Sequence, residues 1–409
     1  MNANGPPPAL AVIAPAGAGE LAEAVRSLAA RGEAALVRGA GTELPQGNLP
    51  RSAAAILSTR ELGGIGVLDA DEGVAHVGAG TPVAALREAA HREGLEVPLD
   101  PPSSESTVGG ALAAAALGPR TLGFGRVRDQ VLGLEVVLGS GERTRCGGRV
   151  VKNVTGYDLA KLYVGSLGTL CVVDHAWLRL RPLPEEVRVV AAPLGDGEDA
   201  VAAALAAARL AGVRAAALVD APLASELGEG VEPPDAGCDL LVVELASDEP
   251  VVAQGAAALA ERHGAVQAPA GAMTAVAALE GPANDARRAR TLRFRVTARS
   301  SRLAAARAAL RAAGALVVTY PGLGLLCARF SLEVEVEGAE DLVRRAFAAA
   351  NAAANAGQGS AILAAGPDAV RAGRDVFGAA PASLALMRRL AAELDPKGVL
   401  NPGVFVGGI

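Results

Sequence analysis

The chain has 409 residues, a formal net charge of −6, 51% hydrophobic residues and 2% aromatic residues. This length can bury a large core and predicts two domains or more. The acidic balance and the scarcity of aromatic rings provide neither the basic surface nor the stacking platforms of a nucleic-acid-binding protein. Four scattered cysteines without CxxC spacing argue against a disulfide scaffold and against an iron–sulfur cluster on this chain.

Neither a membrane-spanning run nor a signal peptide is visible in the sequence. The most hydrophobic stretch, residues 200–218, is mostly alanine and is interrupted by Arg209 and Arg214. The N-terminal residues lack a basic segment followed by an apolar one. We therefore expect a cytoplasmic protein.

The first glycine-rich loop follows a helix and a short strand. Residues 20–31 have apolar side chains at helical spacing and end at Gly32, a favourable C-terminal stop. A strand at 34–37 then leads into the run Arg38-Gly39-Ala40-Gly41-Thr42. Consecutive backbone N–H groups of such a loop can converge on an anion such as a pyrophosphate. Alone, the loop is more typical of an ordinary turn.

A second glycine segment prepares another close approach of backbone. A strand at 74–77 leads into a glycine turn, and Thr81 and Pro82 predict a capped helix that ends near Glu93. The run Thr107-Val108-Gly109-Gly110 then opens an alanine-rich helix that we expect to stop at Gly118. Backbone at a helix start favours phosphate, although most helix starts hold no ligand.

Residues 126–173 predict a hairpin, a loop, a short helix and a glycine turn into a strand. An apolar run at 131–138 turns at Ser140-Gly141 and returns at 142–145. Glycines at 156, 165 and 168 leave bare backbone where a flat or phosphorylated ligand can approach. Residues 177–181 alternate apolar and polar side chains, which predicts a half-exposed strand before the Pro182-Leu183-Pro184 boundary.

The middle of the chain alternates alanine-rich helices with short strands. This pattern predicts an α+β sheet with helices on one face. The expected helices are 198–210, 250–262, 300–313 and 339–353, and the expected strands are 213–219, 240–245, 292–296, 316–320 and 325–330. The tail, 384–405, reads as a helix followed by a Pro-Lys-Gly turn and by Asn401-Pro402-Gly403.

Two common nucleotide-binding patterns do not fit. The first loop has G-x-G without the third glycine of a Rossmann fingerprint, and the turn at residue 78 lacks it too. GxxxxGK[ST] is also absent from the sequence.

The order of these segments resembles the PCMH-type FAD-binding family, the vanillyl-alcohol oxidase type of flavoprotein. The likeness rests on RGAGT, VGAGTP, PPSSESTVGGALA, VRDQVLGLEVVLGSGE, GYDLAKLYVGSLGTL and DPKGVLNPG in that order. GRVVKNVTGYDL and GSLGTL also resemble the FAD-binding subunits of bacterial glycolate oxidases. The resemblance implies an α+β fold with a two-subdomain PCMH-type FAD domain at 1–184 and an α+β cap domain at 185–375. Residues 376–409 would pack back on the FAD domain.

Carried over position by position, the resemblance implies a set of FAD-binding residues. They are Arg38, Gly39, Ala40, Gly41 and Thr42 along the pyrophosphate; Pro102, Thr107, Gly109 and Gly110 beside phosphate and flavin; Lys152, Gly156, Gly168, Thr169 and Val172 past flavin and adenine; and Asn401 at the flavin edge. Some family members attach flavin to a histidine in the first loop, but here the first histidine is His76. The resemblance therefore implies non-covalent FAD.

Catalytic residues are not evident. Oxidation of a 2-hydroxy acid needs a cation for the carboxylate and a base for the hydroxyl. The resemblance would place a histidine-rich metal site near the C-terminus of a catalytic subunit, but the last histidine is His263, so we expect no metal. The four histidines are at 76, 91, 175 and 263, and the first two, which lie in the predicted cofactor domain, are interpreted as ordinary surface or core residues. Arg287-Arg288 and Arg293-Phe294-Arg295 could hold a carboxylate, although such charges more often form a solvated face or a partner surface.

Two main functional hypotheses remain. In the first, the chain is an FAD-binding subunit of a complex that oxidises glycolate to glyoxylate, acting as a flavin relay or an assembly subunit. Its partners would be a second flavoprotein subunit and an iron–sulfur subunit, with at most a peripheral membrane association through them. In the second, it is a self-sufficient FAD-dependent oxidase or dehydrogenase of a small alcohol or 2-hydroxy acid. A third hypothesis, a scaffold that has lost FAD, is disfavoured by the intact glycine loops.

Overall fold

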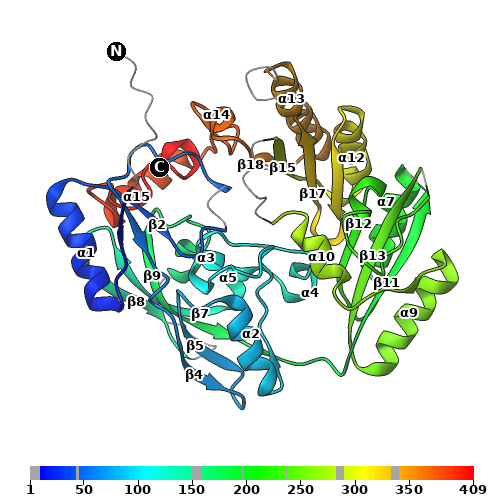
Figure 1. Cartoon of the computed structure of the whole chain (residues 1–409), viewed down its shortest axis with the longest axis horizontal. Coiled ribbons are helices and arrows are strands. Elements are labelled where there is room, and N and C mark those ends of the chain that lie inside the picture. The colour runs from blue at the N-terminus through cyan, green and yellow to red at the C-terminus, as the bar shows by residue number, and fades with distance from the viewer. Residues whose placement is uncertain are drawn as a thin grey trace.

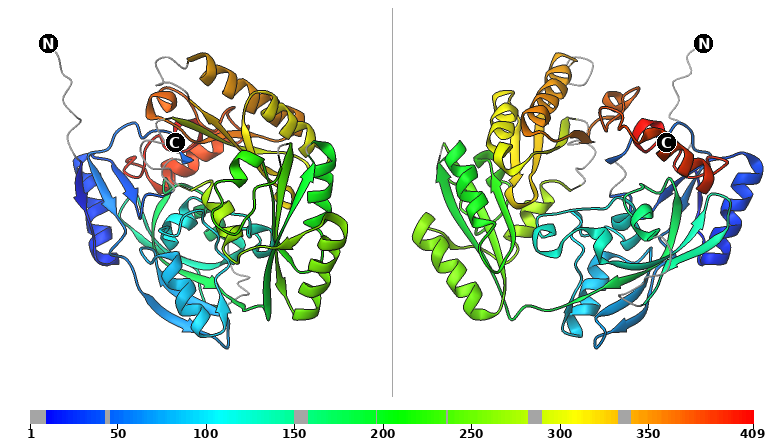
Figure 2. Two further views of the ribbon diagram at one scale, coloured as in Figure 1. Left: turned by 45° about the vertical axis from the view of Figure 1, so that its right-hand side comes forward. Right: turned by 180° about the vertical axis from the view of Figure 1, so that it is seen from behind.

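The computed structural model describes residues 10–42, 46–149, 158–195, 197–235, 237–281, 290–332 and 340–409. Two lobes are visible in Figure 1, one from the first part of the chain and one from the middle. The C-terminal segment, coloured red, returns to the first lobe (Figures 1 and 2). This is the α+β arrangement predicted from the sequence.

A small parallel sheet begins the first lobe. Its order is β1 (Ala11–Ile13), β3 (Ala55–Ser58) and β2 (Ala35–Arg38). Helix α1 (Ala18–Arg31) buries Leu21, Val25 and Leu28, which share one face at helical spacing. The helix ends at Gly32 in the left-handed conformation (φ +64°), so the predicted stop is confirmed.

A five-stranded antiparallel sheet forms the second subdomain of the first lobe. Its order is β4 (Ile65–Asp69), β5 (Val74–Gly78), β9 (Cys171–Arg179), β7 (Val131–Leu138) and β8 (Arg143–Gly147). The predicted hairpin at 131–145 is confirmed as the β7–β8 pair. Strands β6 (Leu95–Glu96) and β10 (Arg181–Pro182) form a separate two-stranded sheet.

Short helices cover one face of this sheet. They are α2 (Val83–Arg92), α3 (Val108–Ala113), α5 (Val127–Gln130) and α6 (Ala160–Tyr163). Helix α4 (Thr121–Phe124) packs against the second lobe instead. Two expectations from the sequence are wrong here. Thr81 is not the N-cap of α2; Pro82 is, and the Thr81 hydroxyl accepts a hydrogen bond from the Gly64 N–H at 2.9 Å. Helix α3 stops well before Gly118, because Ala115 adopts a positive φ of 45°.

The second lobe is built on an eight-stranded antiparallel sheet of order β14-β11-β13-β12-β16-β17-β15-β18. Its strands are β11 (Glu186–Gly195), β12 (Val213–Val219), β13 (Cys238–Ser247), β14 (Val266–Gln267), β15 (Thr291–Thr297), β16 (Leu316–Tyr320), β17 (Leu325–Ser331) and β18 (Ala361–Ala365). The expected pairing of 316–320 with 325–330 is confirmed. Strands β11, β14 and β18 were not predicted.

Both faces of this sheet are apolar, and they differ in their cover. The outer face carries α7 (Glu198–Ala207), α9 (Glu249–His263), α12 (Leu303–Ala312) and α13 (Glu340–Gly357), with η2 (Ser300–Arg302) before α12 (Figure 2). The inner face packs against α8 (Ala221–Ala224), α10 (Ala272–Ala278) and part of the first lobe. Cover by helices on one face alone was therefore wrong, because the inner face is also buried.

The C-terminal segment locks onto the parallel sheet. The segment contains α14 (Asp368–Arg371), α15 (Leu384–Leu394) and η5 (Val406–Gly408), whereas η3 (Pro321–Leu323) lies earlier, between β16 and β17. Between α15 and η5, Leu400 pairs with Ala35 in a parallel β-bridge. The Asp395 carboxylate accepts hydrogen bonds from the N–H groups of Val399 and Leu400 at 3.0 and 2.8 Å. These bonds fix the turn that carries Asn401 towards strand β2.

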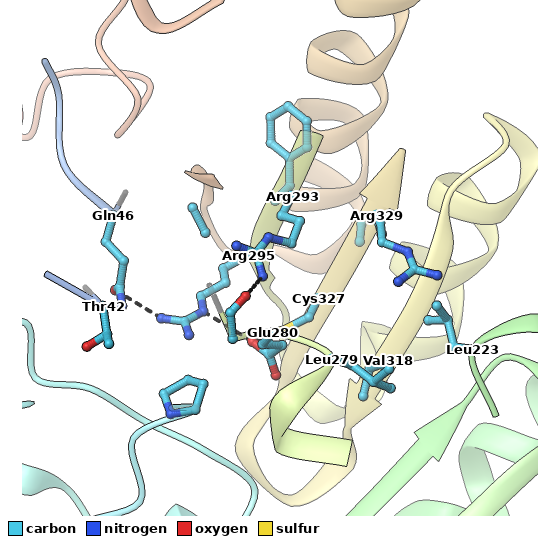
Figure 3. A pocket seen from close by; sticks show the side chains of 15 residues that line it. Thr42, Gln46, Leu223, Leu279, Glu280, Arg293, Arg295, Val318, Cys327 and Arg329 are labelled. Atoms are coloured by element: carbon cyan, nitrogen blue, oxygen red, sulfur yellow. Dashed lines mark hydrogen bonds and ion pairs between the residues drawn. The ribbon is translucent and has the colours of Figure 1, made fainter. Parts of the chain in front are cut away.

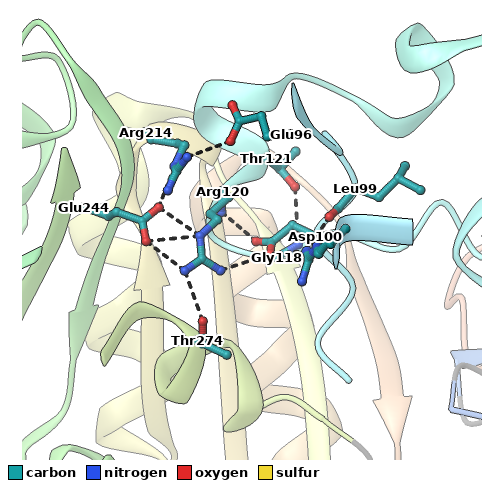
Figure 4. Close-up of polar contacts among 10 residues, drawn as sticks. Glu96, Leu99, Asp100, Gly118, Arg120, Thr121, Arg214, Glu244 and Thr274 are labelled. Atoms are coloured by element: carbon teal, nitrogen blue, oxygen red, sulfur yellow. Dashed lines mark hydrogen bonds and ion pairs between the residues drawn. The ribbon is translucent and has the colours of Figure 1, made fainter. Parts of the chain in front are cut away.

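A buried polar network joins the two lobes (Figure 4). The Arg120 guanidinium, just before α4, donates to both carboxylate oxygens of Glu244 on β13, at 2.8 to 3.1 Å. Arg214 on β12 donates to Glu244 at 2.7 Å and to Glu96 of the first lobe at 2.8 Å. Asp100 accepts from the Arg120 backbone N–H at 2.8 Å. The network fixes the inner face of the cap sheet against the first lobe.

Candidate functional site: a glycine-lined cavity facing an arginine pocket

The first predicted loop leaves strand β2 with its backbone donors exposed. Within the described residues, the N–H groups of Gly39, Ala40 and Gly41 donate no hydrogen bond. Gly41 has a positive φ of 84°, and a Cβ on Gly39 would collide with the hydroxyl of Thr107. Only glycine therefore allows this loop to pass so close to the next one.

The second loop lies directly against the first. Thr107 is the N-cap of α3, and its hydroxyl accepts from the Gly110 N–H at 3.2 Å. Gly109 packs on the end of β5, where a Cβ would come within 2.7 Å of the Ala79 Cβ. The Gly109 N–H donates to the Ala79 carbonyl at 2.8 Å, so the two glycine segments predicted separately form one wall.

The tail completes this wall from the other end of the chain. Asn401 is 3% exposed and has a positive φ of 46°. Its Oδ1 accepts from the Val37 N–H and its Nδ2 donates to the Leu167 carbonyl, both at 2.7 Å. Gly168 has a φ of 69°, and a Cβ there would lie 2.8 Å from the Asn401 Nδ2. Asn401 thus holds strand β2 and the Leu167–Gly168 turn together.

These loops line an open cavity with about 800 Å³ of empty space, part of which is continuous with solvent. Most of the site residues predicted from the sequence line it: Arg38, Gly39, Ala40, Gly41, Thr42, Thr107, Gly109, Gly110, Gly168, Val172 and Asn401. Pro102 lines a neighbouring cavity instead. Thr169 is buried away from the cavity, because its hydroxyl donates to the Ser166 carbonyl at 2.8 Å. Lys152 and Gly156 lie outside the described residues.

Sequence reasoning missed several lining residues. Tyr163, Ser166, Leu167 and Cys171 also line the cavity. Burial raises the pKa of Tyr163 to about 12, so its phenol stays protonated at neutral pH. These residues belong to the LYVGSLGTLC run, which also contains the predicted Gly168, so their position next to the cavity could have been predicted. The prediction considered the glycines of this run and not the side chains at its junction with the strand.

A second cavity of about 620 Å³ lies on the inner face of the cap sheet (Figure 3). Three arginines line it: Arg293 and Arg295 are two apart on β15, and Arg329 pairs with Arg293 across β17. Alternation along the strands therefore places all three on one face. The residues predicted as Arg287-Arg288 lie outside the described residues.

The arginines differ in their partners. Arg295 donates to Glu280 at 3.3 Å and to Gln46 at 3.1 Å, and Arg329 forms an ion pair with Glu226. Arg293 donates to the Gly281 carbonyl and has no carboxylate partner among the described residues. Burial lowers the pKa of Arg293, which shows that its guanidinium is poorly solvated.

An acid and a thiol share the floor of this pocket. The Cys327 thiol donates to the Glu280 carboxylate at 2.8 Å. Burial, followed by the charge of Glu280, raises the pKa of Cys327 well above its usual value, so the thiol is neutral and not an activated nucleophile. Glu280 is the carboxylate that faces the pocket between Arg295 and Cys327 (Figure 3).

The two cavities meet at Thr42, which lines both. Its hydroxyl lies 2.9 Å from that of Ser106, next to the second loop. The chain has four histidines, all within the described residues, and none of them lines either cavity. The first cavity fits a long ligand with a phosphate end, because it combines unpaired backbone N–H groups with glycines that leave no room for a side chain.

These features are those of a two-lobed fold with a cavity suited to a phosphate-bearing cofactor, and comparison with known proteins identifies the class. Residues 9–147 match the model of an FAD binding domain, and residues 183–405 match that of the FAD linked oxidases, C-terminal domain. The second match covers more than half of the chain, so the protein belongs to the FAD-linked oxidases. FAD is the cofactor of this family, as the sequence resemblance predicted.

Several curated relatives share parts of the sequence. The chain is 42% identical to a D-lactate dehydrogenase of Archaeoglobus fulgidus over 173 residues, 42% of this chain and 39% of that protein. It is 37% identical to the glycolate oxidase subunit GlcD of Bacillus subtilis over 193 residues, 47% of this chain and 41% of GlcD. It is 42% identical to GlcE of Escherichia coli over 107 residues, 26% of this chain and 31% of GlcE. The chain thus matches less than half the length of each.

The fold resembles that of a solved structure. An alkyldihydroxyacetonephosphate synthase superposes on 96% of this chain, and 76% of the synthase, with a TM-score of 0.66 at 16% identity. The predicted PCMH-type FAD-binding domain with an α+β cap is therefore confirmed as the fold. A search for membrane spans finds no helix of sufficient length and hydropathy in the parts of the chain that the structure describes.

Proposed function

We propose that this chain is the FAD-binding subunit of an enzyme complex that oxidises a small 2-hydroxy acid, with glycolate to glyoxylate as the leading reaction. One observation carries the proposal: the glycine-lined cavity and the arginine pocket share Thr42, and Arg293 in that pocket forms no ion pair with a carboxylate among the described residues. Relatives named as glycolate oxidase subunits and D-lactate dehydrogenase support this substrate class.

FAD would occupy the glycine-lined cavity. Bound there, it supplies the acceptor for the two electrons that leave the substrate carbon. The unpaired N–H groups of residues 39–41 would hold the pyrophosphate, Gly109 and Gly110 would let backbone approach the flavin, and Asn401 would fix the turn at its edge. Non-covalent binding is supported by the absence of histidine from the cavity lining. The same assignment extends to Pro102, Lys152, Gly156 and Thr169 by resemblance alone.

The cap pocket would receive the substrate anion. Arg293 offers two-pronged hydrogen bonding to a carboxylate, while Arg295 and Arg329 are already neutralised by Glu280 and Glu226. The two matched ranges, 9–147 and 183–405, support a boundary close to residue 184, whereas the proposed division between 185–375 and 376–409 falls inside the second range.

A relay or assembly role fits the missing imidazole base. Substrate oxidation must remove a proton from the hydroxyl, and no histidine lines the pocket to accept it. A second flavoprotein subunit and an iron–sulfur subunit would complete the complex, a proposal supported in part by relatives named GlcD and GlcE. We place such a complex in the cytoplasm or at the membrane surface through its partners.

Glu280 favours the alternative, a self-sufficient oxidase or dehydrogenase. Its carboxylate faces the pocket and lies beside Arg295 and Cys327, where it could accept the hydroxyl proton of a substrate held by Arg293. An autonomous enzyme would depend on this residue, whereas a relay subunit would not.

Anaerobic flavin spectroscopy tests the proposal. The purified chain should show the absorbance bands of bound FAD, and dithionite should bleach them. For a relay subunit, glycolate or D-lactate should bleach them only after the partner subunits are added. Rapid bleaching of the isolated chain by glycolate, abolished in Glu280→Gln, would establish the self-sufficient enzyme instead. A colourless chain that does not take up added FAD would refute both.

A further inference from the structure

A cluster of histidines and carboxylates lies on the five-stranded sheet, away from both cavities. His76 is on β5, Glu135 on β7, and Asp174 and His175 on β9, so three adjacent strands contribute. Glu135 is the direct cross-strand partner of His175. One ligand atom from each of Glu135, Asp174 and His175 lies within 4.8 Å of the others.

A β-bulge explains how neighbours in sequence reach one face. The β7–β9 register runs from the Glu135–His175 pair to the Val136–Val173 pair, so Asp174 is an extra residue without a partner on β7. In regular strands Asp174 and His175 would point to opposite faces. A bulge breaks that alternation and re-aims a side chain, as often happens beside functional sites.

Two buried polar atoms in the cluster lack hydrogen-bond partners. The Asp174 side chain is 4% exposed, and its Oδ1 makes no hydrogen bond within the described residues. The same holds for Nδ1 of His175, which lies 3.0 Å from the Asp174 Oδ2 but is not aligned for a hydrogen bond. A buried carboxylate oxygen left without a partner is costly and needs an explanation.

We propose that Asp174, His175 and Glu135 bind a divalent transition-metal ion, most simply Zn²⁺, as its three protein ligands. Bonds of about 2.0 Å to a tetrahedral ion put ligand atoms about 3.3 Å apart. One pair already has nearly this spacing, Asp174 with His175 at 3.0 Å, while His76 Nε2 contacts Glu135 Oε1 at 3.2 Å and helps to hold that carboxylate. The imidazole of His175 favours Zn²⁺ over Mg²⁺ or Ca²⁺, which prefer all-oxygen sites.

The site is accessible to an ion from solution. The side chains of Glu135 and His175 are 39% and 34% exposed, while Asp174 forms the buried base. The ion would tie β7 and β9 together, and His76 on β5 contacts its ligand Glu135. The Asp174 carbonyl accepts from the Ala79 N–H at 2.8 Å, and Ala79 in turn holds Gly109. The metal is thus placed to stabilise the strands that support the glycine-lined wall, and it is separate from the redox chemistry.

The only tryptophan of the chain reports on this site. Trp177 has its ring centroid 4.6 Å from that of His76, and His76 stacks on His175 at 4.9 Å. The full chain with its FAD should be freed of metal with a chelator and titrated with Zn²⁺, following Trp177 fluorescence and metal content after desalting. We expect saturable, stoichiometric retention of Zn²⁺, and Co²⁺ should quench Trp177 over the same range.

Variants separate this site from surface binding. His175→Ala and Glu135→Gln should each weaken Zn²⁺ binding at least about 100-fold, because even residues that only orient metal ligands contribute 10–100-fold. Glu135 is partly exposed, so Glu135→Gln should fold as the unmodified protein does, which circular dichroism can check. The control is His91→Ala, an exposed histidine on α2 outside the cluster, and it should bind Zn²⁺ normally. Absence of stoichiometric Zn²⁺ in the unmodified chain, or unchanged binding in both cluster variants, would overturn the proposal.

Discussion

The glycine-lined cavity and the arginine pocket meet at Thr42 but are built by opposite means. In the first, backbone carries the binding capacity: residues 39–41 present N–H groups, and glycine is needed so that two loops can touch. In the second, charged side chains from separated strands do the work, with Arg293 and Arg329 facing each other across β15 and β17.

This difference has a physical consequence. Backbone donors held by loop geometry need little further ordering when a ligand binds, so the glycine cavity is prepared for a large cofactor. Arginines in a partly buried pocket must be held by counter-charges, and two of the three are. The glycine-lined cavity is thus a preorganised binding site, whereas the net charge of the arginine pocket can be changed by one substitution.

The largest effect is expected at the polar network between the lobes, because it fixes the lobe that carries the arginine pocket against the lobe that carries the glycine-lined cavity. Glu244 is 1% exposed and is bound by both Arg120 and Arg214. Glu244→Gln should lower the free energy of unfolding by about 3 kcal/mol, the cost of breaking a buried ion pair from one side. Chemical denaturation at pH 7 measures this. Asp341→Asn, in the exposed pair with Arg344, should change little.

The same variant gives a pH dependence with a defined sign. Burial opposes ionisation of Glu244, but the hydrogen bonds and charges of Arg120 and Arg214 outweigh it and lower its pKa. Its stabilising contribution is therefore present above the unfolded pKa of about 4.3 and is lost as the pH falls through the lower folded value. The stabilities of the unmodified chain and Glu244→Gln should converge in acid. A constant difference down to the acid transition would contradict this account.

The next largest effect is expected for Gly39→Val, which changes the wall of the glycine-lined cavity. The added side chain would collide with the Thr107 hydroxyl, so one of the two loops must move. We expect FAD to bind about 100-fold more weakly, or about 2.7 kcal/mol. Titration of the apoprotein with FAD, followed by flavin fluorescence, measures the change. Gly195 has open space around it, so Gly195→Val should bind FAD normally. Equal FAD affinities in the two variants would show that the two glycine loops do not form the FAD site.

Asn401→Ala should have a mixed effect on stability and on FAD. The substitution leaves the Val37 N–H and the Leu167 carbonyl without their partners. Because buried unsatisfied groups cost about 1–3 kcal/mol each, we expect a loss of about 2 kcal/mol, with FAD retained more weakly. Thermal unfolding with and without FAD checks both parts. Asn351→Ala, exposed on α13, is the matched control, and an Asn401→Ala protein as stable as that control would contradict the role of the tail.

The same contrast explains how much could be predicted from the sequence. The glycine loops were visible as local patterns, a strand followed by glycines at short runs such as residues 38–42 and 107–110. Each run alone is typical of an ordinary turn or helix start, so their assignment to one cofactor site came from the family resemblance. The Asn401 turn was placed by resemblance, and its contacts with Val37 and Leu167 span more than two hundred residues in the chain.

The arginine pocket was not readable in this way. The sequence showed Arg293 and Arg295 as a charged strand that could be a solvated face, because alternation does not reveal what covers that face. Glu280 and Arg329 enter the pocket through sheet order, which places β17 beside β15. The bulge at Asp174 is similarly invisible, since it depends on the register between β7 and β9.

The smallest effect is expected for Arg293→Met, and it distinguishes the arginine pocket from the glycine-lined cavity most clearly. Arg293 is the pocket cation without a carboxylate partner among the described residues, so a small carboxylate should bind beside it. Adding glycolate or oxalate to the FAD-loaded chain should therefore perturb the flavin spectrum. Arg293→Met should weaken that binding about 10-fold, or about 1.4 kcal/mol, and leave FAD content unchanged.

Arg299→Met is the control for this substitution, since Arg299 is exposed and outside the pocket lining. If Arg293→Met bound the anion as tightly as the control, the arginines of β15 and β17 would be a partner surface and the substrate anion would bind in another subunit. If FAD were lost together with the anion, the two cavities would be a single site. Weaker anion binding with intact FAD is what two adjoining sites, one built from backbone and one from charged side chains, should give.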